Sequence, residues 1–144
     1  MKIVVQRVSS SNVKVNNEVV AQIERGLHLL VCIEHEDSQQ TLKKAADKIL
    51  ALRIFADEQG RMNRSVVDIE GSILAVSQFT LSWNGKKGNR PSFDGSARPE
   101  IANKMFNEFV EVLQSSVPVE KGVFGESMAV EIHNDGPVTF HIEF

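Results

Sequence analysis

Apolar positions in the first third of the chain follow the pattern of β-structure. Residues 3–8 are rich in β-branched side chains, which favours a strand. Residues 13–15 and 19–21 flank Asn16-Asn17, and because asparagine tolerates positive φ this pair predicts a two-residue hairpin turn. Residues 27–33 form an almost continuous apolar run, which predicts a strand that is buried on both faces.

Two later segments carry the spacing of amphipathic helices. Ser38 is a suitable N-cap for the first helix, and Pro99 suits the first turn of the second. Each helix has one apolar face, which is expected to pack on a sheet. These faces are formed by Leu42, Ala45, Ala46, Ile49 and Leu50 in the first helix and by Ala102, Phe106, Phe109 and Leu113 in the second.

Further strands are predicted around these helices. Residues 53–56 indicate a short strand, and residues 73–81 form the strongest strand pattern in the chain. Apolar residues alternate over 128–132 and again over 138–144, with a turn predicted at 134–137. The resulting order, βββ-α-ββ-α-ββ, predicts an α/β fold in which a mixed β-sheet packs with two main helices.

Composition supports a single globular domain over residues 1–144. The 144-residue chain is 42% hydrophobic and 24% charged, which excludes a disordered or low-complexity protein. Its single cysteine excludes an intramolecular disulfide and a cysteine-based zinc site. The first residues hold too short an apolar run for a signal peptide, and no stretch approaches about 18 apolar residues. We therefore expect a cytoplasmic protein without membrane contact.

Charge is distributed unevenly along the chain. The net charge of −3 argues against a broad nucleic-acid-binding surface, and no DNA partner is expected. Residues 82–98 nevertheless form a long loop with a local excess of positive charge, which suits a phosphate-bearing ligand. A solvated basic loop explains the same charges equally well. The residues of this loop considered for RNA binding are Lys86, Lys87 and Arg90.

The polar sequence Ser77-Gln78-Phe79-Thr80 comes at the end of the strongest predicted strand, where α/β proteins often bind ligands. In a strand, Ser77 and Phe79 share one face, and Gln78 and Thr80 share the other. No Gly-x-Ser-x-Gly elbow surrounds Ser77, which disfavours a hydrolase nucleophile at this residue. Phe79 is interpreted either as a stacking platform for a base or as a core residue.

The other reactive residue types give no recognisable site. Cys32 lies in an apolar run without a basic neighbour, so it is predicted to be a core residue. Gly136-Pro137 is interpreted from the sequence as part of an ordinary turn, with a cis peptide bond as the rarer alternative. We expect neither a metal nor a cofactor, because the histidines lack metal-site spacing. They are His28, His35, His133 and His141.

Three sequence motifs, together with the order in which they occur along the chain, resemble the D-aminoacyl-tRNA deacylase family. This family is also known as the D-Tyr-tRNA deacylase family. The resemblance covers the chain from its first residue to its last strand, and the opening Gln6-Arg7-Val8 fits it as well. The motifs are Ser77-Gln78-Phe79-Thr80-Leu81, Lys87-Gly88-Asn89-Arg90-Pro91-Ser92-Phe93 and Asn134-Asp135-Gly136-Pro137-Val138-Thr139.

The resemblance implies an enzyme that hydrolyses the ester between a D-amino acid and the terminal adenosine of tRNA. It implies a homodimer whose active site lies at the subunit interface. Gly136-Pro137, with a cis bond in this family, is expected to reach into the partner's pocket and accept hydrogen bonds from the substrate ammonium group, while Arg7 holds it in place. A wall of this kind rejects L side chains but spares glycine, so glycyl-tRNA is expected to be a substrate too.

The resemblance also implies roles for the Ser77-Gln78-Phe79-Thr80 sequence. Phe79 is expected to stack on the adenine, while Ser77, Gln78 and Thr80 line the ester and backbone N–H groups near Ser77 and Phe79 form the oxyanion site. The 2′-hydroxyl of the adenosine then helps to activate water. In a rival scheme Thr80 is a covalent nucleophile, which needs an adjacent base. A non-catalytic RNA- or nucleotide-binding module and an interaction protein are the alternative functions.

Overall fold

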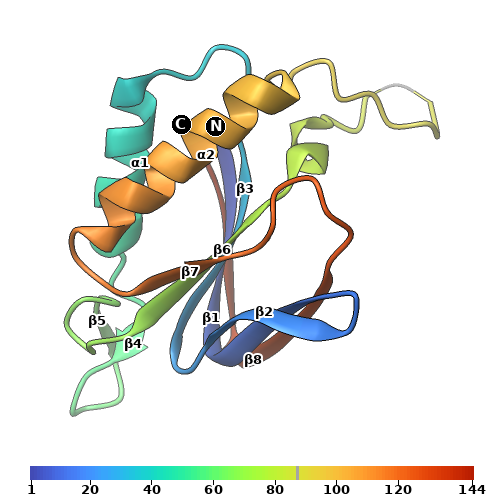
Figure 1. Ribbon diagram of the computed structural model, residues 1–144. Helices are drawn as coiled ribbons and strands as arrows, with labels where there is room; N and C mark the ends of the chain where they lie inside the picture. The colour runs from blue at the N-terminus through green and yellow to red at the C-terminus, as the bar shows by residue number, and fades with distance from the viewer. Residues whose placement is uncertain (87) are drawn as a thin grey trace.

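The computed structural model describes residues 1–86 and 88–144, which fold around one mixed sheet (Figure 1). Its six strands are β1 (Lys2–Val15), β2 (Glu18–Ile23), β3 (Gly26–Cys32), β6 (Ser72–Ser77), β7 (Val119–Lys121) and β8 (Ala129–Glu143). β1 pairs antiparallel with β2, β3 and β8. The β3–β6 and β6–β7 pairs are parallel, so the sheet is mixed, as predicted.

Two helices, α1 (Gln39–Leu50) and α2 (Pro99–Gln114), cover one face of the sheet (Figure 1). α1 begins at the predicted N-cap, where the Thr41 N–H donates to the Ser38 hydroxyl at 3.3 Å. The apolar faces of both helices are buried in the main core against β1, β3 and β6, which confirms the predicted packing. Neither helix in the described part of the chain combines the length and the apolar character needed to cross a bilayer.

The opposite face of the sheet carries a second, smaller apolar cluster. Its buried members are Val8, Val13, Ala21, Ile23, Leu74 and Val76. Because apolar groups cover both faces, β3 is buried over nearly its whole length, as predicted for residues 27–33. The hairpin that joins β1 to β2 turns at Asn16 and Asn17 with φ of 51° and 68°, which confirms the predicted turn.

β6 is shorter than predicted. It ends at Ser77, and residues Phe79–Ser82 form a 3₁₀ helix, η1, so the predicted strand over residues 73–81 is wrong beyond Ser77. The Gln78 N–H still donates to the Val31 carbonyl at 2.7 Å, but the Leu81 N–H closes a local turn onto the Gln78 carbonyl. The strand geometry used to assign residues 77–80 to two faces therefore does not hold beyond Ser77, although the Gln78 and Thr80 side chains do contact each other.

The turn predicted at residues 134–137 is wrong, because β8 passes through this segment without reversing direction. In its pairing with β1, Thr139 lies opposite Gln6 and Asn134 lies opposite Val8. Residues 135–138 therefore stand opposite Arg7 alone and form a bulge, called here the 135–138 bulge. Glycine and proline suit a bulge as well as a turn, since in both the backbone leaves the hydrogen-bonded ladder.

The observed order is βββ-α-βββ-α-ββ, with one more strand between the helices than predicted. A two-stranded sheet of β4 (Phe55–Ala56) and β5 (Met62–Arg64) accounts for the extra strand. β5 and β7 were not predicted, because strands of three residues are too short to establish an alternating pattern. The two strands predicted over 128–132 and 138–144 are one strand, β8.

Candidate active site

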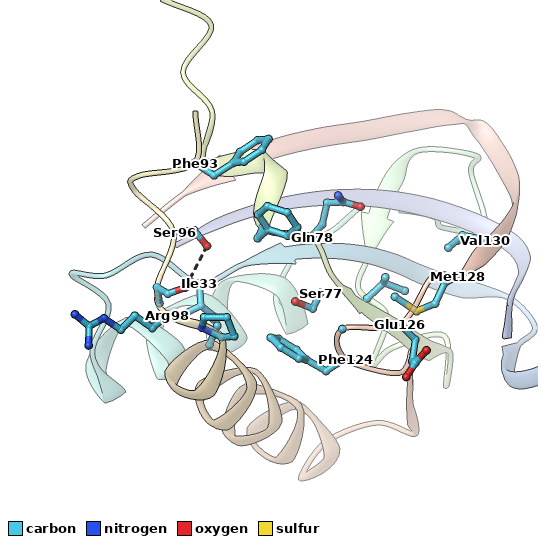
Figure 2. A pocket seen from close by; sticks show the side chains of 16 residues that line it. Ile33, Ser77, Gln78, Phe93, Ser96, Arg98, Phe124, Glu126, Met128 and Val130 are labelled. Atoms are coloured by element: carbon cyan, nitrogen blue, oxygen red, sulfur yellow. Dashed lines mark hydrogen bonds between the residues drawn. The ribbon is translucent and has the colours of Figure 1, made fainter. Parts of the chain in front are cut away.

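A cavity of about 620 Å³ opens at the end of β6, between η1, the start of α2 and the chain that joins β7 to β8 (Figure 2). Its lining is mostly apolar with a few polar groups, which is typical of sites that bind small molecules. The residues that line it include Ser77, Gln78, Phe79, Phe93, Phe124 and Met128. The structure therefore brings three of the four residues of the Ser77-Gln78-Phe79-Thr80 sequence to one site.

Phe79 lies at the rim of this cavity and is 53% exposed, so it is not a core residue. Its ring contacts Phe93 edge-on, with centroids 5.0 Å apart and planes at 79°. Phe93 comes from the long loop over residues 82–98, which places part of that loop against η1. The edge contact leaves ring surface of Phe79 available for stacking on a ligand.

Thr80 does not line the cavity. Its hydroxyl oxygen accepts a hydrogen bond of 2.6 Å from the Gln78 side-chain amide. Among residues 1–86 and 88–144, no histidine or carboxylate is hydrogen-bonded to this hydroxyl. Activation of a threonine nucleophile needs such a base, so this geometry favours a different role for Thr80.

Gly136-Pro137 lies in the 135–138 bulge of β8, and its peptide bond is cis. Arg7 stands opposite the bulge and binds it directly: Nε donates to the Asp135 carbonyl at 3.0 Å. The Arg7 Nη1 group donates to the Ile54 carbonyl at 2.5 Å. The structure thus brings Arg7 to Gly136-Pro137, but neither lines the cavity.

Register across the sheet shows how far the bulge lies from the cavity. Arg7 pairs with Leu27, and Leu27 pairs with Ile73, which precedes Ser77 by four residues along β6. The bulge on β8 is three strand spacings away from β6. With about 4.8 Å between strands and about 3.3 Å per residue, the distance measured along the sheet is roughly 20 Å. Within one chain, the two predicted parts of the active site do not meet.

The described basic residues of the loop over residues 82–98 do not line the cavity, except for Arg98. Lys86 and Arg90 are exposed, while Lys87 lies outside the described residues. Arg98 does line the cavity, but Figure 2 shows its guanidinium pointing away from Ser77 and Phe124. The described basic side chains of this loop, Lys86, Arg90 and Arg98, are therefore exposed to solvent.

Among the described residues, no histidine or cysteine lines the cavity. His28 is fully buried and is not among the residues that line the cavity, and burial lowers its pKa to about 4. Cys32 is buried as predicted, and burial, together with the Glu34 carboxylate, raises the pKa of its thiol. Within residues 1–86 and 88–144, no group of three or more His, Cys, Asp or Glu side chains is arranged to hold a metal ion.

One wall of the cavity was not predicted as part of a site. It is formed by Phe124, Gly125, Glu126, Met128 and Val130, from the chain between β7 and β8 and the start of β8. These residues reach the cavity only because the chain folds back past the end of β6. Their local sequence carries no signal for this, whereas Phe93 could have been assigned from its place in the Lys87–Phe93 motif.

Comparisons with known proteins identify the family. The family model described as D-Tyr-tRNA(Tyr) deacylase matches residues 4–143. A protein named D-aminoacyl-tRNA deacylase, from Chloroherpeton thalassium (strain ATCC 35110 / GB-78), is 53% identical over 145 residues, which cover 99% of this chain and 95% of that protein. Both matches extend over almost the whole chain.

Solved structures share the fold. That of a c-Myc DNA Unwinding Element Binding Protein is 42% identical, with a TM-score of 0.96, and the match covers 100% of this chain and 99% of that one. A second, described as a probable eukaryotic D-amino acid tRNA deacylase, has a TM-score of 0.78 at 18% identity over 98% of both chains. Together with the family match over residues 4–143, these findings show that the chain belongs to the D-Tyr-tRNA(Tyr) deacylase family of enzymes.

Proposed function

We propose that this protein hydrolyses the ester bond of D-aminoacyl-tRNA and releases the free D-amino acid and tRNA. The observation that carries the proposal is the cavity at the end of β6, where Ser77, Gln78 and an exposed Phe79 come together in a member of a deacylase family. Its volume of about 620 Å³ lies within the range of about 300–1,000 Å³ that is usual for small-molecule sites. An aminoacylated adenosine is a ligand of that size class.

Phe79 binds the terminal adenine in this proposal. Stacking of a base on an aromatic side chain contributes about 1–3 kcal/mol. The edge contact with Phe93 restrains the ring, which reduces the conformational entropy lost on binding. Lys86 and Arg90, exposed on the loop that also carries Phe93, then contact phosphates beyond the terminal nucleotide. A local contact of this kind fits a net charge of −3 better than a broad nucleic-acid surface does.

Hydrolysis proceeds without a protein nucleophile. Water adds to the ester carbonyl, the ester C–O bond breaks, and the 3′-oxygen of the adenosine leaves as a hydroxyl group. The neighbouring 2′-hydroxyl helps to activate the water, and the protein contributes orientation and electrostatic stabilisation. Backbone N–H groups near Ser77 and Phe79 stabilise the oxyanion. In support, Phe79 is the first residue of η1, and the first N–H groups of a helix have no acceptor within it.

A second copy of the chain completes the site. The Gly136-Pro137 segment does not line the cavity of its own chain and lies roughly 20 Å from it along the sheet, so another subunit is needed to bring it there. Its carbonyl oxygens hold the substrate ammonium group and leave a D side chain pointing to solvent. An L side chain then collides with the backbone wall, and a discrimination of 10⁴ needs about 5.5 kcal/mol. Glycine has no side chain to collide.

The first test is deacylation of three charged tRNAs by the purified protein. D-tyrosyl-tRNA and glycyl-tRNA are expected to lose their amino acids, and L-tyrosyl-tRNA is expected to stay intact. Loss of radiolabelled amino acid over time measures all three reactions. Binding of tRNA without deacylation of any substrate would instead support the non-catalytic RNA-binding module. A fully resistant glycyl-tRNA would show that discrimination does not rest on steric rejection alone.

Replacement of Thr80 separates the two chemical schemes. Thr80→Ala is expected to lower kcat by less than about tenfold, because it removes one neutral hydrogen bond, worth about 0.5–1.5 kcal/mol. Single-turnover deacylation of D-tyrosyl-tRNA measures the effect, with tRNA binding and circular dichroism as controls for folding. Complete loss of turnover in a folded variant that binds tRNA would support the covalent scheme.

A further inference from the structure

The 135–138 bulge is held at both of its ends. Before it, the Ser9 hydroxyl donates to the His133 carbonyl at 3.2 Å, and the Gln6 amide donates to Asn134 Oδ1 at 3.3 Å. At its far end, Val138 packs against the main core. The backbone between these ends is not paired with β1, so its position depends on side-chain contacts.

The Arg7 guanidinium supplies those contacts and is itself held by Asp135. Arg7 Nε lies 3.0 Å from the Asp135 carbonyl oxygen and 3.2 Å from the Asp135 carboxylate oxygen Oδ2. On the other side of the guanidinium, Nη1 donates to the Ile54 carbonyl at 2.5 Å. One guanidinium thus joins the segment before β4, strand β1 and the first residue of the bulge.

The positive charge of Arg7 makes the Asp135 carboxylate essential for holding the guanidinium against the bulge. The Arg7 side chain is only 13% exposed, whereas that of Asp135 is 46% exposed. A cation that is largely removed from water needs a compensating charge as well as hydrogen-bond acceptors. Within residues 1–86 and 88–144, Asp135 is the one acidic residue within 4.0 Å of the Arg7 guanidinium nitrogens. The two carbonyl acceptors alone leave that charge uncompensated.

We infer that Asp135 is a positioning residue of the deacylase, because its carboxylate holds the Arg7 guanidinium against the bulge that presents Gly136-Pro137 to the substrate. The inference rests on the proposed function, in which this segment contacts the aminoacyl group. Asp135 acts through Arg7 and touches no reacting atom. Loss of its charge frees Arg7 to turn toward solvent and leaves the bulge without its central contact.

The kinetic test uses Asp135→Asn, which keeps the shape of the side chain and removes its charge. For D-tyrosyl-tRNA we expect kcat to fall about tenfold, the scale of a lost charge-assisted contact, with KM changed less than twofold. KM is spared because the surfaces proposed to bind tRNA are untouched. In a double-mutant cycle, Asp135→Asn is expected to have no further effect in an Arg7→Ala background, since the two residues act as one unit.

The structural readout is amide hydrogen exchange of residues 134–139, which does not depend on activity. Asp135→Asn and Arg7→Ala are each expected to accelerate exchange there and to leave β3 unchanged. Asp47→Asn is the matched control: it breaks the exposed Lys43–Asp47 ion pair of α1 and is expected to change neither exchange at 134–139 nor kinetics.

These outcomes separate the inference from the proposed function. Unchanged kcat and unchanged exchange in Asp135→Asn overturn the inference, and so do effects of Arg7→Ala and Asp135→Asn that simply add. A wild-type protein inactive on every aminoacyl-tRNA overturns the proposed function instead. Faster exchange at 134–139 in both variants then still supports the hold of Asp135 on the bulge.

Discussion

Mixing two impaired variants of this protein is expected to give more activity than either variant alone. Phe79→Ala removes the stacking platform of the cavity, and Gly136→Ala damages the bulge that, in our proposal, enters the cavity of the other subunit. In a mixed dimer, one site takes its cavity from the Gly136→Ala chain and its bulge from the Phe79→Ala chain. That site is intact, while the other site carries both defects.

The size of the recovery follows from each defect. Loss of base stacking at Phe79 removes about 1–3 kcal/mol, which lowers kcat/KM by roughly 5- to 150-fold. Gly136 has φ of +133°, and a Cβ there meets the Val138 nitrogen and Cγ2 at 2.9 Å, so the Gly136→Ala bulge must shift. Random exchange of subunits makes about half of the dimers mixed, each with one intact site, so roughly a quarter of wild-type activity is expected.

The matched control is the double variant Phe79→Ala/Gly136→Ala. Mixed with Phe79→Ala, it is expected to give no gain in activity over the separate proteins, because neither chain supplies Phe79. Native mass spectrometry of the two mixtures establishes that mixed dimers have formed. A sample that contains mixed dimers of the two single variants but shows no gain over the separate proteins would contradict a site shared between subunits.

Buried His28 is expected to make the protein lose stability as the pH falls below about 6.5. Its Nδ1 lies 3.0 Å from the Ser11 hydroxyl oxygen, and that hydroxyl donates its proton to the Glu131 carbonyl at 2.7 Å. Nδ1 must therefore carry the hydrogen and donate to Ser11. His28 Nε2 is buried and has no partner among the described residues, so a proton added there finds no acceptor. Burial lowers the pKa of His28 from 6.5 to about 4.

The direction of the effect follows from proton binding. The unfolded chain protonates His28 below pH 6.5, whereas the folded protein does so only below about pH 4. Between these values the unfolded state binds more protons, so the free energy of unfolding falls as the pH is lowered. The loss reaches about 3 kcal/mol once the pH is below both pKa values. Urea denaturation at a series of pH values measures it.

Two variants isolate the contribution of His28. His28→Gln is expected to remove about 3 kcal/mol of the pH dependence, while any loss of packing lowers its stability at all pH values. His35→Gln, at an exposed histidine, is expected to keep the wild-type pH dependence. Equal slopes for wild type and His28→Gln between pH 4 and 6.5 would show that His28 does not titrate in the predicted way.

Elements with a repeating pattern or a specific capping residue could be predicted from the sequence. α1 follows from Ser38 and an apolar face of several turns, and the β1–β2 hairpin follows from two adjacent asparagines. η1 could not be predicted, because polar and apolar residues alternate over 78–81 just as they do in a strand. The hydrogen bond of Leu81 to Gln78, rather than side-chain pattern, ends the strand.

The candidate site was predictable where its residues lie together in the sequence. Ser77, Gln78 and Phe79 belong to one segment, and that segment does form a wall of the cavity. Phe124 and Met128 reach the cavity only through tertiary folding, and no local property of their sequence marks them. The turn expected around Gly136 failed for a different reason. Residues that favour a reversal also favour a bulge, and only pairing with β1 on both sides distinguishes the two.

The 135–138 bulge also restricts how the length of this chain can vary through evolution. β8 resumes its pairing with β1 at Thr139, and Ile142 and Phe144 then face the main core. Side chains alternate along a strand, so these two side chains stay in the core only while Thr139 remains opposite Gln6. Residues 135–138 are not paired with β1, so a residue gained or lost among them changes the size of the bulge and leaves the pairing beyond it in place. In the paired parts of β8 on either side, the same change would turn the following side chains over to the other face of the sheet. Insertions and deletions in β8 are therefore expected to be tolerated by the fold within the bulge and not outside it.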